Sequence, residues 1–394
     1  MEQSGMENIK LYFDYNATTP TDPRVVEAMM PYFFANFHNP SSFYRKAGEA
    51  NEAVEAAREK IAKLINAEPR EIYFTSGGTE SDNLAIQGTI SKLKDKGNHL
   101  ITSAIEHPAV LRCCEFFEKK GFEVTYLPVD KFGIVNPDDL KKNIKDSTIL
   151  VTIMHANNEI GTIQPVKELA KIAHEKGVYF HSDAVQALGK LPIDVKDSDV
   201  DMLSFSSHKI YGPKGIGVFY KKSRVKIDPL AFGGGHERGL RAGTENVPGI
   251  VGMGKAAEFA LNEMPERERR IRPIRDYIQE EIVKRIPEVF INGHTEQRLY
   301  NTLNVSIRFI EGESILAMLD QDGFALSSGS ACSSKSIEPS HVLLALGLKH
   351  EDAHGSLRIS LGKYNTEEDA KRLLEALPPV VERLRMISPF WDKK

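Results

Sequence analysis

Short apolar runs and longer stretches with helical spacing alternate along the chain between residues 70 and 220. The runs are rich in β-branched and aromatic residues, which predicts strands, and apolar residues at three- and four-residue intervals between most of them predict helices. Such alternation predicts a mostly parallel sheet covered by helices. The predicted strands are Ile72–Thr75, Leu100–Thr102, Val124–Leu127, Leu150–Met154, Val178–His181, Met202–Ser206 and Gly217–Tyr220.

Boundary signals place two of the helices. Pro165 suits the first position of a helix, and Gly177 suits the position just past its end. An earlier helix is predicted by apolar residues that share one face: Val54, Ala57, Ile61 and Leu64.

The pattern changes after residue 262. Met264–Arg285 predicts a charged helix with a solvated face, because Arg267, Arg269, Arg270, Arg272 and Arg275 stand among glutamates. Asn304–Phe309 and Leu357–Leu361 predict strands, and a long helix is predicted from the cap Thr366 to Met386.

This change of pattern predicts two domains. We expect a large domain over residues 21–261 and a smaller α+β domain made of residues 1–20 and 262–394. Within the small domain, residues 327–337 are small and polar, which predicts a mobile loop.

Composition narrows the class of protein. The chain has 394 residues with 41% hydrophobic and 27% charged, which is typical of a soluble globular enzyme. A net charge of -4 predicts no strong attraction to nucleic acid or to anionic membranes. Three cysteines, two of them adjacent, indicate a reducing compartment. With no signal peptide and no membrane-length apolar run, we expect a cytoplasmic protein.

One candidate site residue is Lys209, within the segment SFSSHKIYGPKG that follows a predicted strand. Ligands of doubly wound sheets bind at the carboxyl ends of strands. A lysine there, flanked by Ser206 and His208, suits a Schiff-base lysine beside a phosphate site. Taken alone, a lysine in a loop is more often only solvated.

The segment HSDAVQ, also at a strand end, strengthens that interpretation. Asp183 precedes Lys209 with one predicted strand between them. A pyridoxal phosphate (PLP) ring needs a carboxylate that keeps its nitrogen protonated, and Gln186 could donate to the ring's phenolate oxygen. The alternative role for Asp183 is a helix cap.

Other strand ends carry weaker signals. In FTSGGTESDNLA, Gly77, Gly78 and Thr79 open a helix whose N–H groups could bind phosphate, although many loops look like this. His107 could stack on a cofactor ring or be structural, and Asn157 with Asn158 could bond ring substituents or form a turn.

Taken together in this order, the segments resemble the cysteine desulfurases of the NifS/IscS type, which are fold-type I PLP-dependent transferases. The resemblance runs from YFDYNATTP to the last predicted helix and also includes GGGHERGLRAGTENV and SSGSACSSKSIEPSHVLLALGL. One departure is Gly78, because most family motifs have alanine at this position. The resemblance implies an α/β fold whose large domain holds a seven-stranded, mostly parallel sheet.

The resemblance also implies roles for individual residues. Lys209 would form the Schiff base with PLP and act as general base, and Asp183 would pair with the pyridine nitrogen. Arg358 would bind the substrate carboxylate, with Asn157 beside it, and Cys332 would be the nucleophile. Thr244 would reach the phosphate in the partner subunit of a homodimer. The remaining cofactor contacts would be Gly78, Thr79, His107, Asn157, Gln186, Ser206 and His208.

The implied reaction removes sulfur from L-cysteine, which leaves L-alanine and a persulfide on Cys332. His107 is a candidate for helping the thiol ionise, since a free cysteine is a few per cent thiolate near neutrality. The persulfide would pass to an iron–sulfur scaffold protein or to another sulfur acceptor. No intrinsic metal site is expected, and Cys332 is left as a transient iron–sulfur ligand shared with a scaffold. Cys113 and Cys114 are expected in a helix as core residues.

Overall fold

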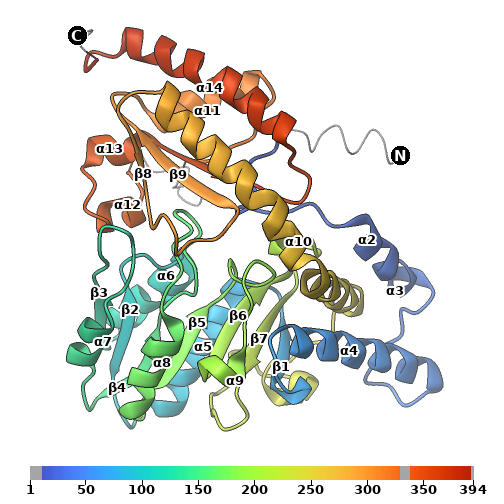
Figure 1. Ribbon diagram of the computed structural model, residues 1–394. Coiled ribbons are helices and arrows are strands. Elements are labelled where there is room, and N and C mark those ends of the chain that lie inside the picture. Colours follow the sequence, from blue (N-terminus) through green and yellow to red (C-terminus); the bar gives the residue numbers. More distant parts are fainter. Residues whose placement is uncertain (1–10, 329–337, 392–394) are drawn as a thin grey trace.

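The computed structural model describes residues 11–328 and 338–391. Its larger sheet has seven strands in the order β1-β7-β6-β5-β4-β2-β3, and β7 is antiparallel to both of its neighbours. The expected α/β class and the seven-stranded, mostly parallel sheet are therefore confirmed (Figure 1). The strands are β1 (Ile72–Thr75), β2 (His99–Ser103), β3 (Glu123–Leu127), β4 (Thr148–Thr152), β5 (Tyr179–Asp183), β6 (Met202–Ser206) and β7 (Gly217–Lys221).

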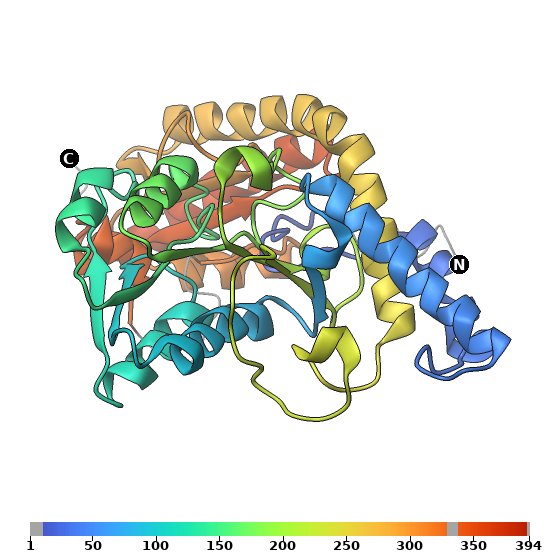
Figure 2. The same cartoon turned by 90° about the horizontal axis from the view of Figure 1, so that it is seen from below.

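Helices cover both faces of this sheet, as Figure 2 shows. Alternate residues of a strand point to opposite faces, so each strand contributes to two clusters of buried residues. Leu100, Leu150 and Met202 belong to the cluster that includes residues of α5 (Gly78–Leu93) and α6 (Pro108–Glu118). The neighbouring residues Ile101, Val151 and Leu203 belong to the cluster formed with α4 (Arg45–Leu64), α8 (Val166–Glu175) and α10 (Val247–Arg285). Because both faces are covered, β1, β2, β4 and β6 are buried at every position.

The helix signals near residue 165 hold to within one position. α8 begins at Val166, so Pro165 is the residue before its first turn rather than its first residue. Gly177 follows the helix with φ of 72°, a left-handed conformation that glycine adopts without strain.

The charged helix is longer than expected and less solvated. It is the second half of α10, a single helix from Val247 to Arg285. The expectation of a solvated face is wrong for Arg267 and Arg275, which are buried. Arg267 lies over the ring of Tyr211, and both arginines share the face of α10 whose isoleucines pack into the core with the smaller sheet, whereas the opposite face of the helix is exposed.

A second, antiparallel sheet has the strand order β10-β9-β8. Its strands are β8 (Val289–Ile291), β9 (Thr302–Ile307) and β10 (Ser356–Ser360), of which β8 is too short and too exposed to be predicted from its sequence. Helices α11 (Gly312–Gln321) and α14 (Glu367–Ile387) contribute to its core. Thr366 caps α14 as expected, because its side chain accepts the Asp369 N–H. The remaining helices are α2 (Pro23–Met29), α3 (Pro31–Phe34), α7 (Pro137–Asn143), α9 (Val195–Ser198), α12 (His341–Ala345) and α13 (His350–His354).

The start of the described chain joins the smaller sheet rather than the larger one. Tyr12 and Asp14 form parallel bridges with Ala325 and Ser360. The boundary predicted after residue 261 falls inside α10, which runs from one sheet to the other (Figure 1). The two-domain division stays a prediction. In the described part of the chain, no helix combines the length and the apolar character that a membrane span requires.

Candidate functional site

A cavity of about 320 Å³ lies where the carboxyl ends of the central strands meet the smaller sheet. In a parallel sheet these ends gather side chains from several strand–helix turns at one edge. Segments after β1, β2, β4, β5 and β6 all contribute, together with the chain start and β10. The lining residues are Asn16, Ala17, Gly78, Thr79, Asp82, His107, Met154, Ala156, Asn158, Asp183, Val185, Gln186, Ser206, His208, Lys209 and Arg358.

Lys209 ends the short 3₁₀ turn that follows β6. Its Nζ donates to the carbonyl oxygens of Asn16 at 2.5 Å and Ala17 at 2.8 Å. An amine bonded to backbone carbonyls is held at a defined point of the wall, where a carbonyl carbon bound in the cavity would lie within its reach.

Two carboxylates and an imidazole meet in the same cavity as this lysine. One ligand atom from each of Asp82, His107 and Asp183 lies within 4.8 Å of the others. Burial raises the pKa of Asp183, while the charges of His107 and Lys209 and the Val185 N–H, which donates to Asp183 Oδ1 at 2.9 Å, lower it. Burial also raises the pKa of Asp82, and the charge of Asp183 raises it further. A positive group bound beside Asp183 would therefore be strongly favoured.

His107 has a structural role as well as a place in the cavity. It caps α6, and its Nδ1 accepts the Ala109 N–H at 3.1 Å. Burial lowers its pKa, so the ring is neutral near pH 7 and Nε2 carries the proton. The ring can therefore donate from Nε2, whereas taking up a proton needs the capping nitrogen to give up its bond.

An anion cradle lies at the start of α5. Gly78 begins the helix, so its N–H and those next to it have no partner within the helix. A Cβ on Gly78 would lie 2.7 Å from Cγ2 of Val185, so the valine methyl takes the space that an alanine side chain would fill. This packing explains the glycine that departs from the family motif. Thr79, Ser206 and His208 complete this side of the cavity, and burial lowers the pKa of His208 to about 4.

Gln186 is held at both ends of its amide. Its Nε2 donates to the carbonyl of Asn16 at 2.9 Å, and its Oε1 accepts from Nζ of Lys190 at 2.7 Å. Asn16 also bonds Lys209 and Asn301, so this one residue connects the chain start to both sides of the cavity. The sequence carries no separate motif that marks Asn16, Lys190 or Asp82 as site residues. The available signals were an asparagine in YFDYNATTP and an aspartate in FTSGGTESDN.

The structure separates the two adjacent asparagines. Asn158 lines the cavity, but Asn157, the residue selected from the sequence, does not. Asn157 is fully buried and fixes its own turn. Its Oδ1 accepts the N–H groups of Glu159 and Ile160, and its Nδ2 donates to the Ile105 carbonyl. With its amide used in these bonds, Asn157 has a structural role, and Asn158 takes its place in the candidate site.

Arg358, in the middle of β10, forms the wall opposite the large sheet. Its Nη2 bonds Asp14 Oδ1 at 2.7 Å, and its Nη1 donates to the Asn158 carbonyl at 3.1 Å. Its Nε is buried without a hydrogen-bond partner in the described chain. A guanidinium with unused N–H groups in a cavity wall is suited to bind a carboxylate.

Cys332 lies outside the described residues, but both flanks of its segment lie beside the cavity walls. The backbone N–H of Arg358 donates to the Ser327 carbonyl at 2.7 Å. On the other flank, Ser340 Oγ donates to Glu159 Oε2 at 2.5 Å. Thr244 is exposed and does not line the cavity of its own chain.

The other two cysteines are core residues of α6, as expected. Burial raises the pKa of the Cys113 thiol to about 12 and raises that of Cys114 as well. Neither thiol is suited to act as a nucleophile near neutral pH.

The fold and this cavity define an α/β enzyme of the aminotransferase kind, and the profile of the family described as Aminotransferase class-V matches residues 11–373. A cysteine desulfurase IscS of Methanosarcina thermophila is 55% identical over 393 residues, which is 100% of this chain and 97% of the relative. Cysteine desulfurase IscS 1 of Archaeoglobus fulgidus is 50% identical over 97% of this chain and 100% of its own.

Solved structures agree with these relatives. A NifS-like protein superposes with a TM-score of 0.90 at 40% identity, covering 95% of this chain and 100% of that one. A structure described as SspA in complex with cysteine gives 0.80 at 40% identity, over 90% and 99% of the two chains. The chain therefore belongs to the class-V aminotransferase family, among its cysteine desulfurases of the IscS and NifS type.

Proposed function

We propose that this protein is a PLP-dependent cysteine desulfurase that removes sulfur from L-cysteine, releases L-alanine and holds the sulfur as a persulfide on Cys332. The observation that carries the proposal is the cavity in which Lys209, the buried carboxylate of Asp183 and the guanidinium of Arg358 line one space of about 320 Å³. The family of the chain and the names of its relatives support the same activity.

The donor set fits pyridoxal phosphate at three points. The start of α5, with Gly78 packed on Val185, offers N–H groups to a phosphate. Asp183 has a pKa raised by burial, so a protonated ring nitrogen next to it would relieve an unfavourable buried charge. Lys209 lines the same cavity with an amine that can form an imine. When bound, this cofactor supplies an electron sink for the charge left on the substrate Cα after deprotonation.

Three residues of the chain would have different roles in the proton transfer from the substrate Cα. Lys209, held by the carbonyls of Asn16 and Ala17, would remove the proton from the substrate Cα and return it nearby. His107, which carries its proton on Nε2, would serve as a hydrogen-bond donor. Asp183 would stabilise the positive charge on the ring nitrogen of the cofactor throughout the reaction.

The smaller sheet would hold the substrate. Arg358 is oriented by Asp14 and by the Asn158 carbonyl, so its remaining N–H groups present one edge to a carboxylate. Fixing the carboxylate at this wall would place the substrate Cα toward the side where Lys209 lies. An amino acid such as L-cysteine, with a carboxylate next to its reacting carbon, suits this arrangement.

Cys332 would accept the sulfur. It lies five positions after Ser327, whose backbone is bonded to Arg358, and such a stretch spans at most about 17 Å. That reach includes the cavity. The thiolate would attack the substrate sulfur, so a new S–S bond forms while the C–S bond breaks and its electron pair stays with the carbon fragment. That fragment gains a proton to become alanine.

The acceptor of the persulfide is proposed to be an iron–sulfur scaffold protein or another sulfur carrier, as the IscS name of the relatives suggests. We also propose a cytoplasmic location, because Cys113 and Cys114 are free thiols.

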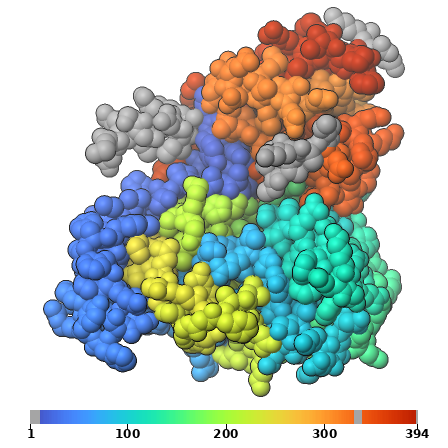
Figure 3. Space-filling view, turned by 180° about the vertical axis from the view of Figure 1, so that it is seen from behind, coloured from blue at the N-terminus to red at the C-terminus, as the bar shows by residue number. Residues whose placement is uncertain are grey.

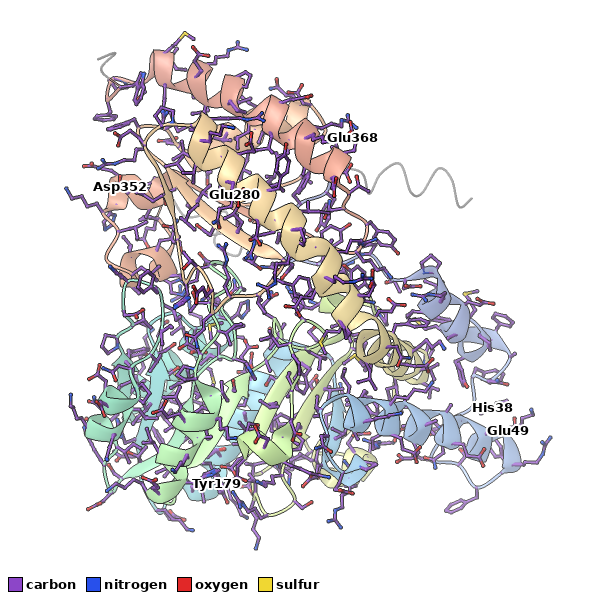
Figure 4. All side chains as sticks on the ribbon, viewed as in Figure 1. His38, Glu49, Tyr179, Glu280, Asp352 and Glu368 are labelled. Atoms are coloured by element: carbon purple, nitrogen blue, oxygen red, sulfur yellow. The ribbon has the colours of Figure 1, made fainter. Side chains whose placement is uncertain are left out.

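We further propose a homodimer with composite active sites. Large aromatic residues are exposed on α3 and the segment leading into α4: Phe33, Phe34, Phe37, Phe43 and Tyr44. The segment projects from the body of the chain (Figure 3), and His38 and Glu49 mark its outer end (Figure 4). Exposed apolar groups gathered in this way favour a protein interface. Thr244 is exposed, which is consistent with a contact between its side chain and the cofactor phosphate in the cavity of a partner subunit. Sedimentation of a fully active monomer would contradict the dimer.

The test is an assay of purified protein, reconstituted with the cofactor, for alanine and sulfide from L-cysteine with a thiol reductant. Equal amounts of the two products are expected. Pyruvate or a keto acid in place of alanine would indicate transamination or elimination and would overturn the proposal.

A further inference from the structure

Lys190 is buried in the turn that follows β5, with 6% of its surface exposed, and no role in the reaction has yet been given to it. Buried lysines are normally paired with a carboxylate. In the described chain Lys190 forms no ion pair. Its Nζ donates instead to two amide oxygens, Gln186 Oε1 at 2.7 Å and Asn16 Oδ1 at 3.1 Å.

These bonds fix the direction of the Gln186 amide. Whether charged or neutral, the amine of Lys190 acts here as a donor, so the oxygen of Gln186 must face it. The nitrogen of the amide is then turned the other way, where it donates to the Asn16 carbonyl. One N–H of Gln186 remains for a group inside the cavity that this side chain lines.

The same contacts bring Lys190 close to the reacting lysine. The Asn16 carbonyl accepts from both Gln186 and Lys209, while the Asn16 side chain accepts from Lys190. Burial, followed by the positive charges of Lys209 and Arg358, lowers the pKa of Lys190. A buried amine that shares its partner with an active-site lysine and has no counter-ion is a costly arrangement, and such cost is typical of functional sites.

We propose that Lys190 is a positioning residue of the reaction. It holds the Gln186 amide with its donor end toward the cavity, where this donor stabilises an anionic oxygen of the bound cofactor beside Lys209. The inference rests on the proposed function. Without Lys190 the amide keeps only its bond to the Asn16 carbonyl, so its donor would be held less firmly toward that anionic oxygen.

The test compares the cofactor-bound wild type with Lys190→Met, which keeps an unbranched side chain one atom shorter and removes the donor. Loss of one hydrogen bond to a charged group predicts kcat lowered about tenfold. The pH midpoint of the visible absorption band should rise by about 0.5 unit, since an unsupported anionic oxygen holds the nearby proton more tightly. Lys171→Met, at an exposed position on α8, is the matched control and should leave both readouts unchanged.

A double-mutant cycle separates positioning from a role in folding. If Lys190 acts through Gln186, then Lys190→Met adds nothing to Gln186→Leu, in either kcat or the spectral midpoint. Additive losses, or a Lys190→Met enzyme that titrates like the wild type, would overturn the inference.

Lys190→Gln retains a donor and covers the possibility that the methionine variant does not fold. If neither variant yields folded protein, Lys190 serves the fold and the inference is wrong. A wild type with neither absorption band nor turnover would instead contradict the proposed function.

Discussion

The two walls of the cavity are built in different ways. The wall on the larger sheet takes between one and three residues from each of five strand ends, such as His107, Asp183 and Lys209. The wall on the smaller sheet brings together Asp14, Ser327 and Arg358, which are far apart in the chain. The first wall offers groups for a cofactor and proton transfer, and the second offers a carboxylate site and the flanks of the segment that holds Cys332. Variants in the two walls should therefore fail at different steps.

The largest effect is expected from Cys332→Ser, because a hydroxyl is a far weaker nucleophile than a thiolate. Sulfide release should fall by on the order of 10⁶-fold, as for another enzyme that loses its nucleophile. The variant should still bind the cofactor and L-cysteine, and absorbance spectra measure this binding.

Mass spectrometry gives the matching positive result. Wild type treated with L-cysteine without reductant should carry added sulfur on the peptide that contains Cys332. Cys113→Ala is the control, because that thiol is buried with a raised pKa. Sulfur found on Cys113 or Cys114 would contradict the assignment.

Lys209→Ala changes the wall on the larger sheet and should stop the reaction at an earlier step than Cys332→Ser does. General acid–base groups contribute about 10² to 10⁴-fold, so we expect turnover to fall by about 10³-fold. The absorption band of the imine should disappear from purified protein, whereas Cys332→Ser retains it. If Cys332→Ser also loses the band, the two walls do not serve different steps.

Asp183→Asn keeps the shape of the side chain but removes the negative charge. An asparagine oxygen can still accept the Val185 N–H, so the fold should be retained. We expect the rate of Cα deprotonation to fall by about 10²-fold, because the positive ring nitrogen loses its counter-ion. Exchange of the Cα hydrogen of L-alanine with deuterated solvent measures this step without Cys332. Unchanged exchange would count against the role of Asp183.

Arg358→Lys tests the smaller-sheet wall. A lysine keeps the charge but cannot form the paired bonds of a guanidinium, so KM for L-cysteine should rise about 10-fold. The spectrum of the resting enzyme should not change. Asp14→Asn, which loosens the arginine without removing it, should have a smaller effect in the same direction.

The smallest effect is expected where the walls meet, at the bond from Ser340 to Glu159. Burial raises the pKa of Glu159 from 4.5 to about 7, so the folded protein holds this proton more tightly than the unfolded chain does. Its contribution to stability is therefore present below pH 4.5 and is lost as the pH rises toward 7.

Glu159→Gln retains an acceptor for Ser340 and removes the titration. Thermal unfolding of the cofactor-bound protein should then depend less steeply on pH between about 4.5 and 7. If the unfolding temperatures of wild type and variant depend equally on pH in this range, Glu159 is already ionised in the folded protein.

Much of this protein could be predicted from the sequence because its signals are local. Strand runs such as Met202–Ser206 match the structure, since β-branched and aromatic residues between turn signals favour short buried strands. Asp183 and Lys209 were identifiable because each lies at the carboxyl end of one of two parallel neighbouring strands, and that topology by itself brings strand ends together.

Tertiary structure decided what depends on distant neighbours. Asn157 and Asn158 are the same residue type in the same turn, and only the bonds of Asn157 to Ile105 and Glu159 turn it away from the cavity. Lys190 is one lysine among many in the sequence, and it becomes a buried donor only because the chain start folds back to place Asn16 beside it. Arg267 and Arg275 were expected in solvent, but they lie on the face of α10 that packs into the core with the smaller sheet, which buries them. Local propensity is set by adjacent residues, whereas burial and hydrogen-bond partners are set by segments that meet only in the folded chain.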